Sequence, residues 1–357
     1  MELTLFDYDY PEDLVAQRPL PERDSSRMML VDRARRSFDH SRVSLLPSIL
    51  RRGDLLVLND SRVAAARLFG TIRGGERVEL LVVEKDPDRT DAWRCLLRQA
   101  KRMRAGEKIF FGMQATATVA GRDGAFLLVD FKGDSLALAE RFHGVPPLPP
   151  YIKRDGYSSY TDEDRARYQT VYANNPGSAA APTAGLHLSG ALLDSLAAAG
   201  VETASVTLHV GIDTFTPVRA ENLEDHTMHG ERVEIGEEAA HRITMAKAEG
   251  RRVICVGTTA ARAIESAAAF EVEGSAGFLS WANGRIHHGA WTTRLFIRPG
   301  YEFRAMDAII TNFHQPRSTL LTMVSAFAGR EFILSCYREA VRERYRLFSY
   351  GDCMFIV

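Results

Sequence analysis

Two hydrophobic patterns divide the chain. Between residues 66 and 152, short β-like apolar runs follow one another, separated by bends rich in glycine and without a helical period between them. Strands at this spacing are typical of a small barrel or sandwich. The six predicted strands are 68–72, 77–84, 92–97, 108–111, 115–119 and 125–131. We therefore predict an inserted six-stranded β-barrel domain over residues 66–152.

Outside this insert, strand-like runs alternate with helical patterns. The predicted strands are 28–32, 54–58, 201–210, 252–256, 292–298 and 308–311. The predicted helices are 13–17, 45–50, 162–172, 190–199, 236–249, 257–266 and 331–348, with a further apolar helix after Arg317. Alternation of strand and helix indicates a sheet covered by helices. We predict an α/β catalytic domain that is discontinuous in sequence, built from residues 1–65 and 153–357.

Composition narrows the class of protein. The chain has 357 residues, a formal net charge of −1 and an ordinary apolar fraction, so a polyanionic partner requires a local basic patch. Its four cysteines are far apart and form no C-x-x-C pair, which favours a reducing compartment. The first residues do not resemble a signal peptide, and the apolar segment 318–329 is too short to cross a bilayer. We expect a soluble, cytoplasmic protein without a membrane segment.

Candidate chemistry is concentrated between residues 181 and 234. Four of the ten histidines lie there, His187, His209, His226 and His229, and Asp225 and Glu231 flank the last two. Histidine is the side chain whose unperturbed pKa lies nearest neutrality, so the cluster is a candidate for proton transfer or metal binding.

Three interpretations of these histidines stay open on residue type alone. A zinc or iron site of a metal-dependent hydrolase is one, although no H-E-x-x-H motif is present. Partly buried histidines that only satisfy backbone carbonyls are another. We favour a role without a metal, in acid–base catalysis or substrate binding, in which Asp225 or Glu231 shifts the pKa of an imidazole.

Two strand ends are candidate binding edges. Gly257, Thr258 and Thr259 form a glycine turn at a predicted helix start, where free N–H groups favour an anion. A simple N-cap at Thr258 is the alternative. The second edge carries Asn312, His314 and Arg317 after an apolar strand.

One loop of the predicted barrel is basic. It contains Arg98, Lys101, Arg102, Arg104 and Lys108. A solvated charged face accounts for such a loop, and so does contact with a nucleic-acid backbone, where lysine and arginine displace counterions.

Motifs along the whole chain identify a resemblance. They are GDLLVLNDSR at 53–62, YQTVY at 168–172, APTAGLH at 181–187, TLHVG at 207–211, DHTMH at 225–229, VGTT at 256–259, TNFH at 311–314 and SYGD at 349–352. In this order they resemble the S-adenosylmethionine:tRNA ribosyltransferase-isomerases of queuosine biosynthesis. Three positions depart from that pattern. The family usually has glycine where this chain has Asp213, serine or alanine where it has Gly230, and leucine where it has Gln315.

The resemblance implies a transferase and isomerase that acts on tRNA. It implies transfer of the ribosyl part of S-adenosylmethionine to 7-aminomethyl-7-deazaguanine (preQ1) at the tRNA wobble position, giving epoxyqueuosine, methionine and adenine. S-adenosylmethionine is then a substrate, no metal or other cofactor is implied, and we expect a monomer. The rival classes are a metal-dependent hydrolase and a non-catalytic tRNA-binding module.

With this chemistry in view, each candidate residue receives an expected role. The expected catalytic residues are His226, His229, Asp225 and Glu231. The expected substrate-binding residues are Thr183, His187, His209, Gly257, Thr258, Thr259, Asn312 and His314, with the methionine carboxylate at 257–259. The expected tRNA-binding residues are Arg98, Lys101, Arg102, Arg104 and Arg317.

Overall fold

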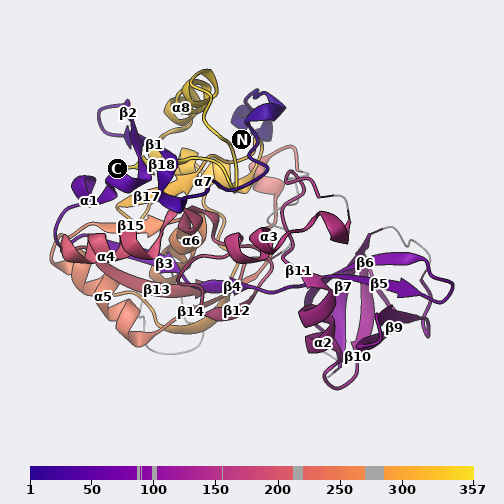
Figure 1. The fold of residues 1–357 in the computed structure, drawn as a ribbon. Coiled ribbons are helices and arrows are strands. Elements are labelled where there is room, and N and C mark those ends of the chain that lie inside the picture. The colour runs from indigo at the N-terminus through magenta and orange to yellow at the C-terminus, as the bar shows by residue number, and fades with distance from the viewer. Residues whose placement is uncertain (87–88, 90, 99–102, 155, 212–219, 270–284) are drawn as a thin grey trace.

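Two separate sheets form the framework of the computed structural model, which describes residues 1–86, 89, 91–98, 103–154, 156–211, 220–269 and 285–357. A large sheet with covering helices forms one body, and a small barrel projects from it (Figure 1). The predicted class, an α/β domain with an inserted β-barrel, is confirmed.

The large sheet has nine strands among the described residues. In order across the sheet they are β16 (Gly289–Thr293), β14 (Glu231–Ile235), β13 (Glu202–Leu208), β3 (Leu55–Asn59), β15 (Val253–Val256), β17 (Ala308–Asn312), β18 (Cys353–Ile356), β1 (Arg27–Asp32) and β2 (Ser37–Arg42). The neighbours β13, β3, β15 and β17 are parallel. Parallel strands point the same way, so their C-terminal ends meet at one edge of the sheet.

Helices cover both faces of this sheet. They are α1 (Leu46–Ile49), α4 (Gly190–Ala198), α5 (Glu237–Ala248), α6 (Thr258–Ala268), α7 (Thr319–Ala328) and α8 (Arg330–Arg342). Helix α3 (Asp162–Arg167) contributes no residue to the cores on the two faces of the sheet. Along β3, Leu55 and Val57 belong to the core that includes α5 to α8, whereas Leu56 and Leu58 belong to the core of α1 and α4. Successive side chains of a strand point to opposite faces, so both faces of β3 are buried.

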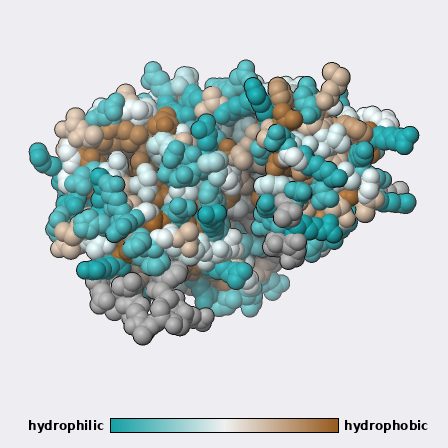
Figure 2. Space-filling view, turned by 90° about the horizontal axis from the view of Figure 1, so that it is seen from below, coloured by the Kyte–Doolittle hydropathy of each residue, from teal (hydrophilic) through white to brown (hydrophobic). Residues whose placement is uncertain are grey.

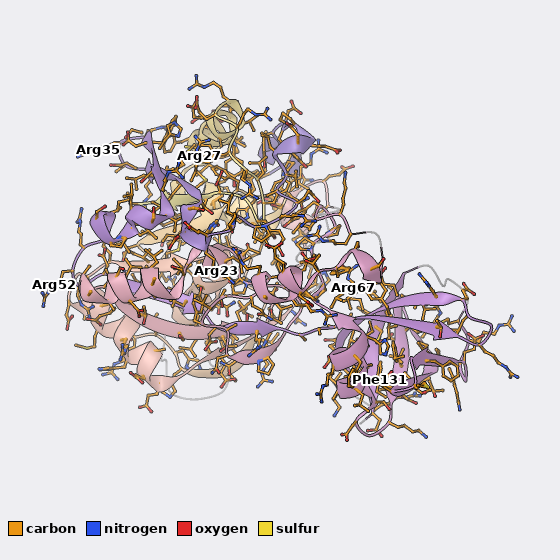
Figure 3. The ribbon with its side chains drawn as sticks, in the orientation of Figure 1. Arg23, Arg27, Arg35, Arg52, Arg67 and Phe131 are labelled. Carbon is orange, nitrogen blue, oxygen red and sulfur yellow. The ribbon has the colours of Figure 1, made fainter. Side chains whose placement is uncertain are left out.

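The small sheet closes on itself. Its strands are β5 (Arg67–Ile72), β6 (Arg77–Lys85), β7 (Ala92–Arg98), β10 (Phe126–Phe131), β9 (Ala115–Asp123) and β8 (Lys108–Phe111), and β8 pairs again with β5. All six predicted strands are thus confirmed. Apolar side chains such as Phe111 and Phe131 fill the interior. Phe131 is labelled in Figure 3. From below, hydrophilic side chains cover most of the visible surface, and apolar ones form smaller patches (Figure 2).

A short neck joins the two sheets. It contains β4 (Ser61–Val63), β12 (Asn175–Ser178) and β11 (Gly144–Val145), which extends the barrel edge beside β5. Arg67 lies at this neck (Figure 3), where it pairs with Glu79 at 2.6 Å and donates to the Leu148 carbonyl at 3.3 Å. The domain limits 66 and 152 stay a prediction.

The sequence pattern missed several elements of the barrel and the main sheet. Helix α2 (Ser135–His143) packs on the barrel through the buried Ala139, and β11 follows it. Strands β2, β14 and β18 were also not predicted, although β18 lies inside the main sheet between β17 and β1.

Four predicted elements have wrong boundaries, each for a tertiary reason. Helix α3 ends at Arg167, because the Gln169 side chain bonds to the backbone of Val63 and takes the chain out of the helix. Helix α8 ends at Arg342, before left-handed residues at Arg344 and Phe348.

The helix expected at 13–17 is a 3₁₀ turn, Glu12–Leu14, since Val15 bridges to Leu347 instead. The strand expected at 292–298 is β16, which ends at Thr293 after pairing with β14.

No single helix of the described residues has the length and apolar character of a membrane span. Helices α7 and α8 reach that composition only as a pair, bent by 114° at the break between them.

The neck provides a direct test of packing. A Cβ atom at Gly144 would lie 2.3 Å from the Ala65 carbonyl oxygen and 2.5 Å from the Glu140 carbonyl oxygen. We expect Gly144→Ala to lower the free energy of unfolding by about 1–3 kcal/mol, measured by urea denaturation, because backbone atoms must move. The control Gly190→Ala meets no atom within 4 Å and should be near neutral. Equal stability of the two variants would contradict the packing of the neck.

Candidate active site

Two connected cavities lie where the parallel strands end. The inner pocket is lined by Tyr151, 180–184, Val210, 257–259, 311–315, Ser318, Leu320, Phe348 and Ser349. The outer groove, about 1280 Å³ in volume, runs from barrel residues Val83, Glu84, Trp93, Arg94 and Phe126 to main-sheet residues that include His209, 225–232 and Arg262. Val210, Thr258, Thr259 and Leu320 line both. A small-molecule pocket therefore opens into a wider groove between the two sheets.

The end of β3 is internally satisfied. Asn59 donates to the Leu208 carbonyl at 3.0 Å and accepts from the Leu208 N–H at 3.0 Å. Asp60 accepts from the Thr207 hydroxyl at 2.7 Å and from the Asn175 amide at 3.2 Å. These polar residues join β3 to β13 and β12, which is a framework role.

The start of α6 carries free donors toward both cavities. Gly257 has a φ of 96°, a left-handed conformation that favours glycine, and it turns the chain from β15 into α6. The first helical bond runs from the Ala261 N–H to the Gly257 carbonyl at 3.2 Å, so the N–H groups before it have no intrahelical partner. Gly257, rather than Thr258, is the N-cap, and it has no side chain to cap the helix. The Gly257 N–H itself donates to the Ile310 carbonyl at 2.8 Å, so within the predicted anion site at 257–259 the free donors begin at Thr258.

A buried ion pair supports the groove from behind. Arg262 on α6 pairs with Glu231 on β14, and both side chains are buried. Arg262 also donates to the carbonyls of His229 at 3.2 Å and Thr293 at 3.4 Å, and Glu231 accepts from the Gly211 N–H at 3.1 Å. Burial lowers the pKa of Arg262, and the charge of Glu231 opposes that effect. Glu231, predicted to be catalytic, therefore lies in a salt bridge that positions residues 229–231.

Three predicted histidines line the outer groove. His226 contacts the edge of Phe296 with ring centroids 5.4 Å apart, and partial burial, then the nearby His229, lower its pKa. His209 packs against Gly177, and within the part of the chain that the structure describes its buried Nδ1 atom has no hydrogen-bond partner. Burial and then Arg232 lower its pKa. Both imidazoles are consequently neutral near pH 7 and able to accept a proton. Asp225 is exposed beside them.

Two other histidines are structural in their surroundings. His187 bonds through Nδ1 to the Ser26 hydroxyl at 3.0 Å and through Nε2 to the Asn312 amide at 3.0 Å. Burial lowers its pKa to about 4, with Arg346 and Arg23 adding to the effect. His314 bonds to the Thr311 hydroxyl at 2.8 Å, and burial lowers its pKa to about 3. Both rings are neutral hydrogen-bonding groups at physiological pH.

The four-histidine cluster expected from sequence spacing is thus divided. His187 is not among the described residues that line either cavity, and it reaches the inner pocket only through Asn312. In the parts of the chain that the structure describes, no three His, Cys, Asp or Glu side chains are close enough to share a metal ion. The geometry therefore gives the metal-dependent hydrolase interpretation no support.

The predicted tRNA-binding residues are only partly described. Arg104 is exposed beside the barrel, whereas the Arg98 side chain, Lys101 and Arg102 lie outside the described residues. Arg317 pairs with Asp7 on the main domain. The departure Asp213 also lies outside the described residues, and Gln315 lines the inner pocket.

The structure adds residues that the sequence pattern did not single out. Trp93 and Arg94 on β7 form the barrel wall of the groove, and Arg94 pairs with Asp123 at 2.9 Å. Arg262 is a lone arginine inside an alanine-rich helix, which is a sequence signal for a buried charge with a partner. Ser26 had no such signal, because its partner His187 is 161 residues away.

Comparisons with known proteins extend over the whole chain. A sequence model described as "Queuosine biosynthesis protein" matches residues 3–356. The S-adenosylmethionine:tRNA ribosyltransferase-isomerase of Anaeromyxobacter sp. (strain Fw109-5) is 46% identical over 359 residues, covering 100% of this chain and 99% of that protein. The protein of the same name from Geobacter sulfurreducens is 45% identical over 359 residues, with 100% of both covered.

A solved structure is similar in fold. The crystal structure of S-adenosylmethionine tRNA ribosyltransferase from Thermotoga maritima has 30% sequence identity and a TM-score of 0.54, and the match covers 99% of this chain and 100% of that one. The similarity thus includes both the main sheet and the barrel.

The buried neutral histidines predict how stability depends on pH. An unfolded histidine binds a proton below about pH 6.5, whereas folded His187 does so only near pH 4. The contribution of His187 to the free energy of unfolding is therefore fully present above pH 6.5. It is lost as the pH falls toward 4, by on the order of 3 kcal/mol. We expect His187→Gln to flatten the pH dependence of the unfolding free energy between pH 6.5 and 4. His241→Gln, at an exposed position on α5, should keep the wild-type curve; equal curves for all three proteins would contradict the prediction.

Proposed function

Because the chain belongs to the queuosine biosynthesis protein family, we propose that it transfers and isomerises the ribosyl group of S-adenosylmethionine onto preQ1 in tRNA. The products are epoxyqueuosine-tRNA, methionine and adenine. The observation that carries this proposal is the end-to-end identity of 46% with a relative named for that activity. S-adenosylmethionine is a substrate in this scheme, and the reaction requires no further cofactor.

The two cavities suit two substrates of different size. The inner pocket is enclosed by the ends of the parallel strands and accepts part of a small molecule. The outer groove lies between the barrel and the main sheet, where a nucleotide of a larger RNA has room to enter. In this proposal S-adenosylmethionine extends from the inner pocket into the groove, and its methionine carboxylate binds the N–H groups at the start of α6. The preQ1 base enters from the groove and meets the ribosyl group where the cavities join.

The chemistry requires proton transfers that the groove can perform. The preQ1 amine must lose a proton, a weakly acidic C–H next to the sulfonium must be removed, and departing adenine must gain a proton. His226 and His229 are the proposed acid–base residues, and the lowered pKa of His226 keeps its imidazole ready to accept a proton. His209 is a further candidate, since it lines the same groove and its buried Nδ1 has no hydrogen-bond partner among the described residues.

The acidic residues receive different proposed roles. Asp225 is an exposed carboxylate beside His226 and is proposed to stabilise an imidazolium or the sulfonium charge. Glu231 forms a salt bridge with Arg262, and Arg262 donates to the His229 carbonyl. The proposed role of Glu231 is therefore to hold the segment that contains His229.

Recognition of tRNA is proposed to involve the barrel. Trp93 and Phe126 offer aromatic surfaces at the groove, and aromatic side chains stack with unpaired bases. Arg98 is the last residue of β7, and Lys101, Arg102 and Arg104 follow it in sequence; this basic segment is proposed to contact phosphates. Arg317 is a weaker candidate in this scheme, because its guanidinium pairs with Asp7. We propose that the protein acts in the cytoplasm as a monomer.

Adenine release tests the proposed reaction and its acid–base residues together. Wild-type protein should release adenine from S-adenosylmethionine only in the presence of preQ1-containing tRNA, measured by chromatography. Removing a general acid or base typically costs 10²–10⁴ in rate, so we expect His226→Ala or His229→Ala to lower turnover about 100-fold or more. His241→Ala on the exposed face of α5 is the control.

The same assay separates the rival functions. Near-native turnover by both groove variants would refute the assigned roles of His226 and His229. A non-catalytic tRNA-binding module would bind tRNA and consume no S-adenosylmethionine. A metal-dependent hydrolase would lose activity on treatment with a chelator.

The salt dependence of RNA binding tests the barrel loop. Replacing Arg98, Lys101, Arg102 and Arg104 with glutamine should weaken tRNA binding and reduce the slope of log K against log salt by about 0.7 for each lost phosphate contact. Arg35 and Arg52 are exposed and lie far from the barrel (Figure 3), so their replacement with glutamine is the matched control. Unchanged affinity and slope in the loop variant would remove this loop from the interface.

A further inference from the structure

Two residues that line the inner pocket carry a buried polar side-chain atom that has no hydrogen-bond partner among the described residues. In the described part of the chain, the pocket residues with such side-chain atoms are Asn312, at Oδ1, and Thr259, at Oγ1. Asn312 is 2% exposed, so its oxygen has lost water as well. Buried polar groups in folded proteins are almost always hydrogen-bonded. An unsatisfied acceptor beside a cavity therefore indicates a donor supplied by a ligand.

The amide of Asn312 has only one possible orientation. Its nitrogen donates to the Phe348 carbonyl at 3.1 Å and lies 3.0 Å from Nε2 of His187. A carbonyl only accepts, so the atom that faces Phe348 must be the amide nitrogen. The Ser26 hydroxyl donates to the Arg23 carbonyl at 3.4 Å, which leaves its oxygen to accept from Nδ1 of His187 at 3.0 Å. His187 Nε2 then accepts from Asn312, and Oδ1 stays unsatisfied.

The neighbouring strand brings an anion site to the same pocket. Val256 on β15 pairs with Ile310 on β17, and the Gly257 N–H donates to the Ile310 carbonyl at 2.8 Å. The free N–H groups of α6 and the Asn312 oxygen thus follow adjacent strands and line one cavity. A ligand that satisfies both carries an anion and an N–H donor close together.

The lining of the pocket restricts the charge of this ligand. Among its described lining residues there is no lysine, arginine, aspartate or glutamate, and His314 is neutral. An isolated charge is costly to bury without a partner, whereas a zwitterion brings both signs and is neutral overall. An α-amino acid has this character, with carboxylate and ammonium on the same carbon atom.

We propose that the inner pocket is an α-amino-acid subsite that holds the methionyl end of S-adenosylmethionine. The carboxylate binds the first N–H groups of α6, and the α-ammonium donates to Asn312 Oδ1, with Thr259 Oγ1 beside it. His187 is a positioning residue that fixes the Asn312 amide and does not touch the substrate. This subsite rests on the proposed function, because that function supplies the amino acid.

Substrate analogues test the subsite by calorimetric binding without tRNA. We expect wild-type protein to bind the analogue with hydrogen in place of the α-ammonium about 10- to 100-fold more weakly than S-adenosylmethionine, the usual effect of a lost charged hydrogen bond. Decarboxylated S-adenosylmethionine should bind more weakly by a similar factor, because it lacks the carboxylate that contacts the N–H groups of α6. In Asn312→Leu, S-adenosylmethionine itself should bind about 10- to 100-fold more weakly, and removal of the ammonium should cost nothing further.

The pocket contains a matched control. Gln315 is also an amide that lines the inner pocket, and Gln315→Leu should discriminate against the deaminated analogue as wild-type protein does. His187→Gln retains an acceptor for the Asn312 amide and should preserve discrimination, whereas His187→Leu should lose it. A difference between the two His187 variants would show that His187 acts by orienting the Asn312 amide, because both variants remove the same imidazole.

Several outcomes would overturn the subsite. Equal binding of S-adenosylmethionine and the deaminated analogue by wild-type protein is decisive even if Asn312→Leu fails to fold. The inosyl analogue, which lacks the 6-amino group of adenine, tests a purine in this pocket. If wild-type protein binds it more weakly than S-adenosylmethionine and Asn312→Leu binds both equally, the pocket would be assigned to the purine instead. Adenine release, assayed in parallel, reports the ribosyl transfer separately. If wild-type protein distinguishes the deaminated analogue but releases no adenine, the result counts against the proposed function alone. If it releases adenine but binds the deaminated analogue as tightly as S-adenosylmethionine, the result counts against the subsite alone.

Discussion

Parallel pairing of four strands, three of them buried along their whole length, is the constraint on which the site depends. β13, β3, β15 and β17 hydrogen-bond side by side, and both faces of β3 are covered by apolar side chains. A shift of one residue in β3 would move the side chains packed in one core into the other and disrupt the packing of both. The register is therefore strongly determined, and with it the positions at which His209, Gly257 and Asn312 leave the sheet.

The polar groups at this edge are organised in two layers. The deeper layer is a set of neutral hydrogen-bonding groups, in which Ser26, His187 and Asn312 form one chain. Burial holds the pKa of His187 at about 4, so this chain keeps its donors and acceptors unchanged through the physiological range. The outer layer faces the groove and contains His209 and His226, whose pKa values are lowered by partial burial. A fixed inner layer and a titratable outer layer suit a site that holds one substrate and moves protons on another.

The barrel contributes a wall rather than a second active centre. Its described strands form a closed sheet around an interior filled with apolar side chains, and this packed sheet presents Trp93 and Arg94 at the groove. The neck is narrow, and contacts such as Arg67 with Glu79 and Leu148 fix its path. The shape of the groove consequently depends on a few packed residues, among them Gly144, which has no room for a side chain.

Local pattern determined much of this protein, and tertiary structure decided the rest. The six barrel strands, the buried strands and the glycine turn before α6 follow from periodicity and turn chemistry, because those signals lie within a few residues of each other. The motifs also sufficed to identify the family. The partners of Glu231 and His187 were not predictable in this way: Arg262 is 31 residues away and Ser26 is 161 residues away. Spacing grouped four histidines, but the fold buried His187 behind Asn312 and left the other three at the groove, since burial depends on contacts between distant segments.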